Sequence, residues 1–137
     1  MTSALAGGAA GMAVMTVVLV LLEVQTRSEV GLFAVVARFV GMPGQIFLGF
    51  VLFVVAGLLA WPLLFLALEP YLPLGPDPAV RAMVLTAGLW VAFVLAGRGD
   101  LSGPILVVYV AVTLLAHLAY GFTLGAVYAR LAGVPTR

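Results

Sequence analysis

The chain has 137 residues, of which 65% are hydrophobic and 8% are charged, and its formal net charge is +1. Soluble domains are roughly 45–50% apolar and about 25% charged, so eleven charged side chains (six basic and five acidic) are too few to cover a soluble fold of this size. The six arginines are scattered, which excludes a nucleic-acid-binding surface, and the lack of cysteine excludes disulfides and thiolate chemistry. The composition therefore predicts an integral membrane protein in contact with the lipid bilayer.

Four apolar runs are long enough to cross a membrane as helices. A bilayer core about 30 Å thick requires around 20 apolar residues in a helix, because only a helix satisfies its own backbone polar groups in lipid. The runs therefore predict a single all-α, polytopic domain over 1–137 with four transmembrane helices. The first run follows no basic segment of the kind that opens a secretory signal, and we expect it to remain as an uncleaved span. The predicted spans are approximately 4–22, 45–68, 79–96 and 104–129.

The segment between the first two spans has a different pattern. Ser28 is a suitable N-cap, and Glu29 places a negative charge in the first turn, where the helix dipole favours it. Arg27 and Arg38 fall on one narrow stripe of such a helix, and large apolar side chains cover the remainder. Because the segment is too short to span a bilayer, we expect a short interfacial helix near 28–40. The alternative is a lid packed over the end of the bundle.

The second predicted span and the connection after it contain backbone signals. Pro62, after Trp61, predicts a kink, because proline lacks the N–H of a regular helix. We expect the carbonyl groups that this proline frees to be satisfied by threonine hydroxyls or water. Glu69, at the end of the span, is interpreted as a marker of the membrane surface. Asp77 lies in a proline-rich turn, where aspartate commonly bonds the local backbone.

The last predicted span contains most of the polar side chains expected within the bilayer. Five of them fall within about 100° of one another on a helical wheel. Because lipid offers a polar group no hydrogen-bond partner, this face is expected to point into the protein. The predicted polar intramembrane face consists of Tyr109, Thr113, His117, Tyr120 and Tyr128.

His117 is the chain's only histidine, and three roles are compatible with it. Its imidazole can form a hydrogen bond across the bundle, handle a proton or a quinone, or ligate a haem or metal ion. A metal site needs more ligands than one imidazole, and a bis-histidine haem would need a second subunit. We expect His117 to be buried and hydrogen-bonded, and we expect no metal or other cofactor.

Glycines at four-residue spacing border this polar face and also occur in the first span. In lipid, helices are held together by close packing and polar contacts, and small residues let two backbones approach. Gly121 and Gly125 are therefore predicted to lie at a contact between helices. Gly7 and Gly11 are predicted to do the same in the first span.

The last span also carries a family resemblance. The stretch from His117 to Tyr128 has the pattern H-x-x-Y-G-x-x-L-G-x-x-Y, which resembles the last helix of small microbial four-helix membrane proteins of uncharacterised function. The segments 37–44 (ARFVGMPG) and 97–104 (GRGDLSGP) are similar to the same group. The resemblance implies an integral protein of a prokaryotic cell membrane and a loose relation to cytochrome oxidase subunits. It assigns no catalytic residue.

The functional expectation follows from what the spans lack and from this resemblance. No predicted span has an acid, lysine or arginine near its centre, and the chain has no serine–histidine–acid set, HExxH motif or phosphate-binding loop. We therefore expect no enzyme, but an accessory or assembly subunit of a larger membrane complex, respiratory according to the resemblance. Its expected partners are other membrane subunits or further copies of itself. Two alternatives stay open: a small oligomeric transporter or channel, and a redox protein with His117 as a haem ligand.

Overall fold

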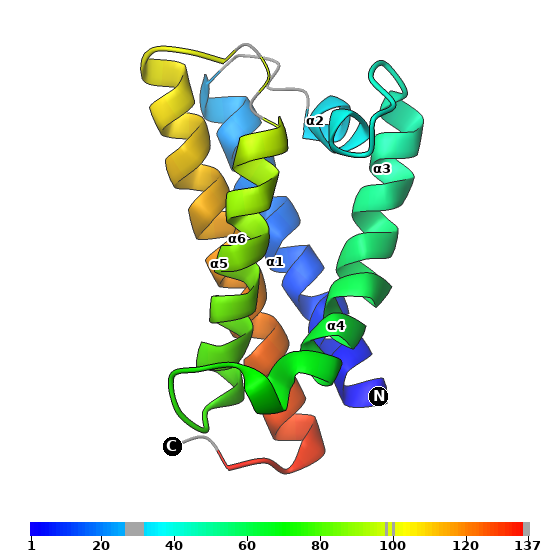
Figure 1. Ribbon diagram of the computed structural model, residues 1–137, viewed down its shortest axis with the longest axis vertical. Helices are drawn as coiled ribbons and strands as arrows, with labels where there is room; N and C mark the ends of the chain where they lie inside the picture. The colour runs from blue at the N-terminus through cyan, green and yellow to red at the C-terminus, as the bar shows by residue number, and fades with distance from the viewer. Residues whose placement is uncertain (27–31, 98, 100, 136–137) are drawn as a thin grey trace.

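The computed structural model describes residues 1–26, 32–97, 99 and 101–135, and these residues form helices joined by short connections (Figure 1). No strand occurs among them. The helices are α1 (Thr2–Thr26), α2 (Leu32–Phe39), α3 (Ile46–Val55), the π-helical turn η1 (Ala56–Ala60), α4 (Trp61–Leu68), the 3-10 turn η2 (Glu69–Tyr71), α5 (Pro78–Gly97) and α6 (Pro104–Ala132).

Four of these helical stretches are long and apolar enough to cross a membrane. The second is a continuous run that joins α3, η1, α4 and η2, so the kinked helix still counts as one span. The observation confirms the predicted all-α fold with four transmembrane helices, and the protein is an integral membrane protein. The stretches are Thr2–Leu21, Ile46–Tyr71, Pro78–Gly97 and Pro104–Ala132, which match the predicted spans to within a few residues.

Helix α6 makes the most extensive contacts of the bundle, since it packs against both α1 and α5. The second span joins this group through η1 and α4, which pack against α1. Its first half, α3, diverges from α5 and α6 and packs instead against α2. The second span therefore packs against α1 near the N-terminus of α1, whereas at the other end its first half, α3, stands apart from α5 and α6.

Glycines mark the tightest crossings of α6. A Cβ added to Gly121 would lie 2.8 Å from the carbonyl oxygen of Ala82 in α5, and one added to Gly125 would lie 2.5 Å from Cα of Ala79. In α1, a Cβ at Gly7 would lie 2.5 Å from the Leu124 carbonyl oxygen. A Cβ at Gly11 would similarly lie 3.0 Å from the Tyr120 carbonyl oxygen. All four glycines named from the sequence thus lie at contacts between helices of this chain, where a side chain would separate the backbones.

Helix α2 crosses one end of the bundle, level with the ends of the spans (Figure 1). It packs against α3 and α5, and its Val35 and Ala37 are fully buried. The guanidinium of Arg38 donates a hydrogen bond to the Gly97 carbonyl oxygen over 3.2 Å. The short helix predicted near 28–40 is thus present over 32–39, and it also forms a lid between two spans. The predicted cap residues Ser28 and Glu29 lie outside the described residues.

The opposite end is closed by polar contacts around the start of α5. The backbone N–H of Ala79 donates to Asp77 Oδ1 over 2.8 Å, which confirms the local bond predicted for this aspartate. Arg81 forms an ion pair with Glu69 and donates to the Gly75 carbonyl oxygen over 2.7 Å. These bonds tie the proline-rich connection to both spans that it joins.

Candidate functional site

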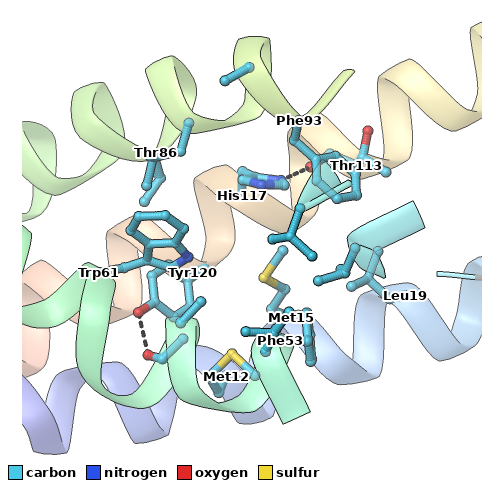
Figure 2. A pocket seen from close by; sticks show the side chains of 17 residues that line it. Met12, Met15, Leu19, Phe53, Trp61, Thr86, Phe93, Thr113, His117 and Tyr120 are labelled. Atoms are coloured by element: carbon cyan, nitrogen blue, oxygen red, sulfur yellow. Dashed lines mark hydrogen bonds between the residues drawn. The ribbon is translucent and has the colours of Figure 1, made fainter. Parts of the chain in front are cut away.

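A cavity of about 230 Å³ lies inside the bundle, where α3 diverges from α5 and α6 (Figure 2). Its walls come from all four spans and from the α2 segment. The lining residues are Met12, Met15 and Leu19 of α1; Val36 and Val40 in and after α2; Leu52, Phe53, Ala56, Gly57 and Trp61 of the second span; Thr86, Leu89, Ala92 and Phe93 of α5; and Thr113, His117 and Tyr120 of α6.

The position of the cavity follows from which helices touch. Helices α3 and α5 form opposite walls but do not pack against each other along their length, and the cavity is partly open. Helix α2 bridges these two walls at one end, and the contact of η1 with α1 narrows the space at the other. Ala92 of α5 lines the cavity and is also exposed at the surface of the bundle.

His117 is the most chemically versatile side chain on the lining. Its Nδ1 lies 2.7 Å from the Thr113 carbonyl oxygen, one turn earlier in α6. The bond was expected to run across the bundle, but the imidazole instead bonds to its own helix, because a helical carbonyl four residues back is within reach. The ring of Phe93 packs against the imidazole, with 5.4 Å between the ring centroids. The hydrogen bond to Thr113 and the contact with Phe93 together hold the imidazole at the cavity wall (Figure 2).

Thr113 connects α6 to α5 beside the cavity. Its hydroxyl donates to the Tyr109 carbonyl oxygen over 2.6 Å and accepts a bond of 3.2 Å from Trp90 Nε1. The hydroxyl of Thr86, on the α5 wall, donates to the Ala82 carbonyl oxygen over 3.0 Å. The hydrogens of both threonine hydroxyls are therefore engaged within the protein.

Tyr120 joins α6 to the π-helical turn of the second span. Within η1 the Trp61 N–H bonds to the Ala56 carbonyl, and Pro62 has no N–H, so the Gly57 carbonyl loses both of its helical donors. The Tyr120 hydroxyl takes their place and donates to the Gly57 oxygen over 2.6 Å (Figure 2). Threonine or water was expected in this role, and that expectation is wrong for Gly57: a tyrosine from another helix satisfies its carbonyl.

The structure brings together three of the five residues of the predicted polar face. Thr113, His117 and Tyr120 line the cavity. Tyr109 is fully buried nearer to α2, and its hydroxyl has no hydrogen-bond partner among the described residues. Tyr128 lies toward the other end of α6, where its ring packs edge-on against Phe65 with 5.5 Å between the centroids.

Much of the lining was not identified from the sequence. Met12 and Phe93 have only apolar neighbours in the chain, so nothing local distinguishes them from lipid-facing residues. Gly57 did carry a signal. It lies five residues before Pro62, which is the spacing at which a proline removes a donor from a widened helical turn.

The chemistry available to this cavity is mainly recognition. Apolar side chains dominate the lining, and its polar side chains are the indole, imidazole and hydroxyl groups already described, with no carboxylate among them. Among the described residues, no cluster of three or more histidine, cysteine, aspartate or glutamate side chains could hold a metal ion. Such a lining suits an apolar ligand that forms hydrogen bonds with one or two polar groups of the cavity.

Among known proteins, the chain matches a family but no individually characterised member. No curated protein and no solved structure matches it. The family match spans the whole chain and confirms the resemblance to uncharacterised four-helix membrane proteins. Residues 1–137 match the model of a family described as a family of unknown function (DUF6789), and the chain belongs to that family.

Proposed function

We propose that this protein is a non-catalytic binder of a small apolar molecule that enters from the bilayer. The observation that carries the proposal is the cavity of about 230 Å³, with walls from all four spans and with α3 and α5 not packed against each other beside it. An apolar cavity of about 150 Å³ in another protein is large enough to bind benzene. The volume here therefore suits a substituted ring or a short chain.

Binding without chemistry is supported by the side chains on the lining. His117 is the only imidazole on the lining and no carboxylate accompanies it, whereas acid–base catalysis commonly pairs two such groups. The Tyr120 hydroxyl is engaged with the Gly57 carbonyl, so it serves the bundle rather than a reaction. An apolar ligand would replace lipid or empty space and would gain contacts with aromatic rings from three of the four spans.

The test is to fill the cavity. Ala56 lines it, whereas Ala60, four residues later in the same turn η1, is exposed and is not part of the lining. We expect Ala56→Phe to occupy part of the space, while Ala60→Phe adds the same ring on the lipid side. Organic extracts of each protein, purified in mild detergent, are compared by mass spectrometry.

The expected result is a molecule retained by the wild type and by Ala60→Phe and depleted in Ala56→Phe. The comparison has to be made between variants of equal thermal stability, since an unfolded protein loses any ligand. Identical extracts from all three folded proteins, with no retained molecule that depends on Ala56, would overturn the proposal.

An accessory role in a larger membrane assembly is a second candidate, and one observation favours it. Gly88, in the middle of α5, is the one glycine of the described helices at which an added Cβ would meet nothing within 4 Å. Ala92 and Ala96 follow at four-residue spacing, and both are exposed. Small residues at this spacing let a second helix approach closely in lipid. A helix from a partner subunit or from another copy of this chain would fit the stripe formed by Gly88, Ala92 and Ala96.

This second function is tested by size and co-purification. Gly88→Leu would hold a docked helix away from α5, whereas Ala111→Leu alters an exposed position of α6 and serves as its control. We expect the wild type and the control to extract as a complex by native mass measurement, and Gly88→Leu to extract as a single chain. A monomeric wild type, or a complex that Gly88→Leu leaves intact, would contradict the accessory role.

A further inference from the structure

From the hydrogen bonds around the cavity, we infer that its ligand carries a hydroxyl group, and that this hydroxyl donates its hydrogen to Nε2 of His117. The inference rests on the proposed function, which supplies a ligand, and adds the chemical class of that ligand.

The tautomer of His117 follows from its partner. A carbonyl oxygen only accepts hydrogen bonds, so the Nδ1 that lies 2.7 Å from the Thr113 oxygen carries the hydrogen. In the neutral imidazole, Nε2 then has no hydrogen and presents a lone pair. No described residue donates to Nε2, and the ring lies on the cavity wall (Figure 2). The cavity therefore contains a strong acceptor without a donor.

The neighbouring hydroxyl groups do not donate a hydrogen bond to Nε2 of His117. The hydrogens of Thr86, Thr113 and Tyr120 all go to backbone carbonyl oxygens, over 3.0, 2.6 and 2.6 Å. Trp61 has the remaining polar hydrogen on the lining, and its indole N–H has no partner among the described residues. The Nε2 of His117 thus requires a ligand that donates a hydrogen bond, whereas the indole N–H of Trp61 requires a ligand that accepts one.

Energetics favours His117 as the selecting group. A site built to pair with a hydroxyl discriminates strongly against an analogue that lacks it, because the polar group of the site is then left without a partner. A hydroxyl can supply the hydrogen for Nε2, and its oxygen keeps the capacity to accept. An ether offers only an acceptor and leaves the imidazole unpaired.

The experiment compares two probes of nearly equal shape, 4-bromophenol and 4-bromoanisole. The bromine quenches tryptophan fluorescence, and Trp61 on the lining and Trp90 beside Thr113 are the two tryptophans of the chain. Titrations use the full chain in a bromine-free detergent, as wild type, His117→Phe, Ala56→Phe and Ala60→Phe. A brominated aliphatic alcohol of similar size, titrated beside its methyl ether, distinguishes an aromatic from an aliphatic hydroxyl.

We expect the wild type and Ala60→Phe to bind an alcohol at least several-fold more tightly than its methyl ether. His117→Phe should bind both members of the pair with equal affinity, and Ala56→Phe should bind neither. Equal affinities in the wild type, tighter binding of the ethers, or a preference that survives in His117→Phe would overturn the inference while leaving a binding cavity. Quenching that is the same in the wild type and Ala56→Phe would overturn the proposed function itself.

A second measurement needs no variant. Because His117 is the only histidine, histidine labelled with ¹⁵N gives one Nε2 signal from the whole protein. We expect 4-bromophenol to shift this signal in the direction of a newly accepted hydrogen bond and 4-bromoanisole to leave it in place. An Nε2 signal that does not respond to the phenol would overturn the inference even where His117→Phe does not fold.

Discussion

The hydroxyl of Tyr120 in α6 donates a hydrogen bond of 2.6 Å to the backbone oxygen of Gly57, 63 positions earlier in the chain. Gly57 lies within the π-helical turn η1, where the widened helix and Pro62 remove the donors that its carbonyl would normally have. A tyrosine of one helix thus supplies the hydrogen bond that a backbone carbonyl of another helix lacks. The turn η1 also supplies Ala56 and Gly57 to the cavity lining, so the same bond holds one wall of the cavity in place.

Replacing Tyr120 by phenylalanine should destabilise the protein by about 1 kcal/mol, because the Gly57 carbonyl then stays unpaired within the bundle. The measurement is reversible unfolding by a denaturing detergent. Tyr128→Phe is the control, since the described contact of Tyr128 is made by its ring against Phe65. Adding Pro62→Ala should reduce the cost of Tyr120→Phe, because the backbone regains an N–H there. Equal stabilities of Tyr120→Phe and Tyr128→Phe would contradict this account.

A methyl group at Gly125 should weaken the crossing of α6 with α5. The added Cβ would lie 2.5 Å from Cα of Ala79 and still closer to the Pro78 carbonyl oxygen. Because backbone atoms cannot turn aside as a flexible side chain can, Gly125→Ala should cost about 1–3 kcal/mol. Gly88→Ala is the matched control, a mid-helix glycine whose added Cβ meets nothing within 4 Å. Thermal unfolding in detergent should rank Gly125→Ala well below Gly88→Ala, and the reverse order would refute the packing argument.

The tautomer of His117 can be measured directly. The bond from Nδ1 to the Thr113 carbonyl oxygen predicts that the neutral imidazole carries its hydrogen on Nδ1. Nitrogen chemical shifts of ¹⁵N-labelled histidine should place Nδ1 in the protonated range and Nε2 in the unprotonated range. The free amino acid under the same conditions serves as the reference. The opposite assignment would show that the imidazole does not donate to Thr113.

The cap of α5 gives a prediction outside the apolar core. Asp77 Oδ1 accepts the Ala79 N–H over 2.8 Å and so satisfies one of the free donors at the start of the helix. Asp77→Ala should cost about 1 kcal/mol, while Asp77→Asn keeps an oxygen acceptor and should cost much less. Chemical unfolding of the three proteins under one condition makes the comparison. Equal losses from both substitutions would show that the cap does not stabilise α5.

The sequence predicted the spans well because its signal is local. Each apolar run must become a helix in lipid, where a backbone without internal hydrogen bonds is too costly, and runs of sufficient length and hydropathy reveal this without knowledge of their neighbours. The same reasoning holds for Asp77, whose partner Ala79 is two residues away. Gly121 and Gly125 were predicted to lie at a helix contact, but the sequence did not identify α5 as the partner.

For the polar face of α6, the sequence did not predict which side chains lie together in the folded protein. A helical wheel groups Tyr109, His117 and Tyr128 on one side, yet the structure separates them along the helix axis, and only His117 of these three lines the cavity. The partner of His117 was predicted in another helix and lies in its own. A wheel gives the angle of a side chain around its helix, whereas the neighbours along the axis depend on how the helices cross.

The amino-acid sequence by itself determined that this chain forms four apolar spans, with small residues and polar side chains concentrated in the last one. The tertiary structure alone decided that α3 diverges from α5, that Tyr120 meets the freed carbonyl of Gly57, and that His117 faces a cavity. The physical reason is the range of the interactions. Helix formation in lipid depends on hydrogen bonds four or five residues apart, while a cavity is the space left by side chains of helices that are far apart in the chain.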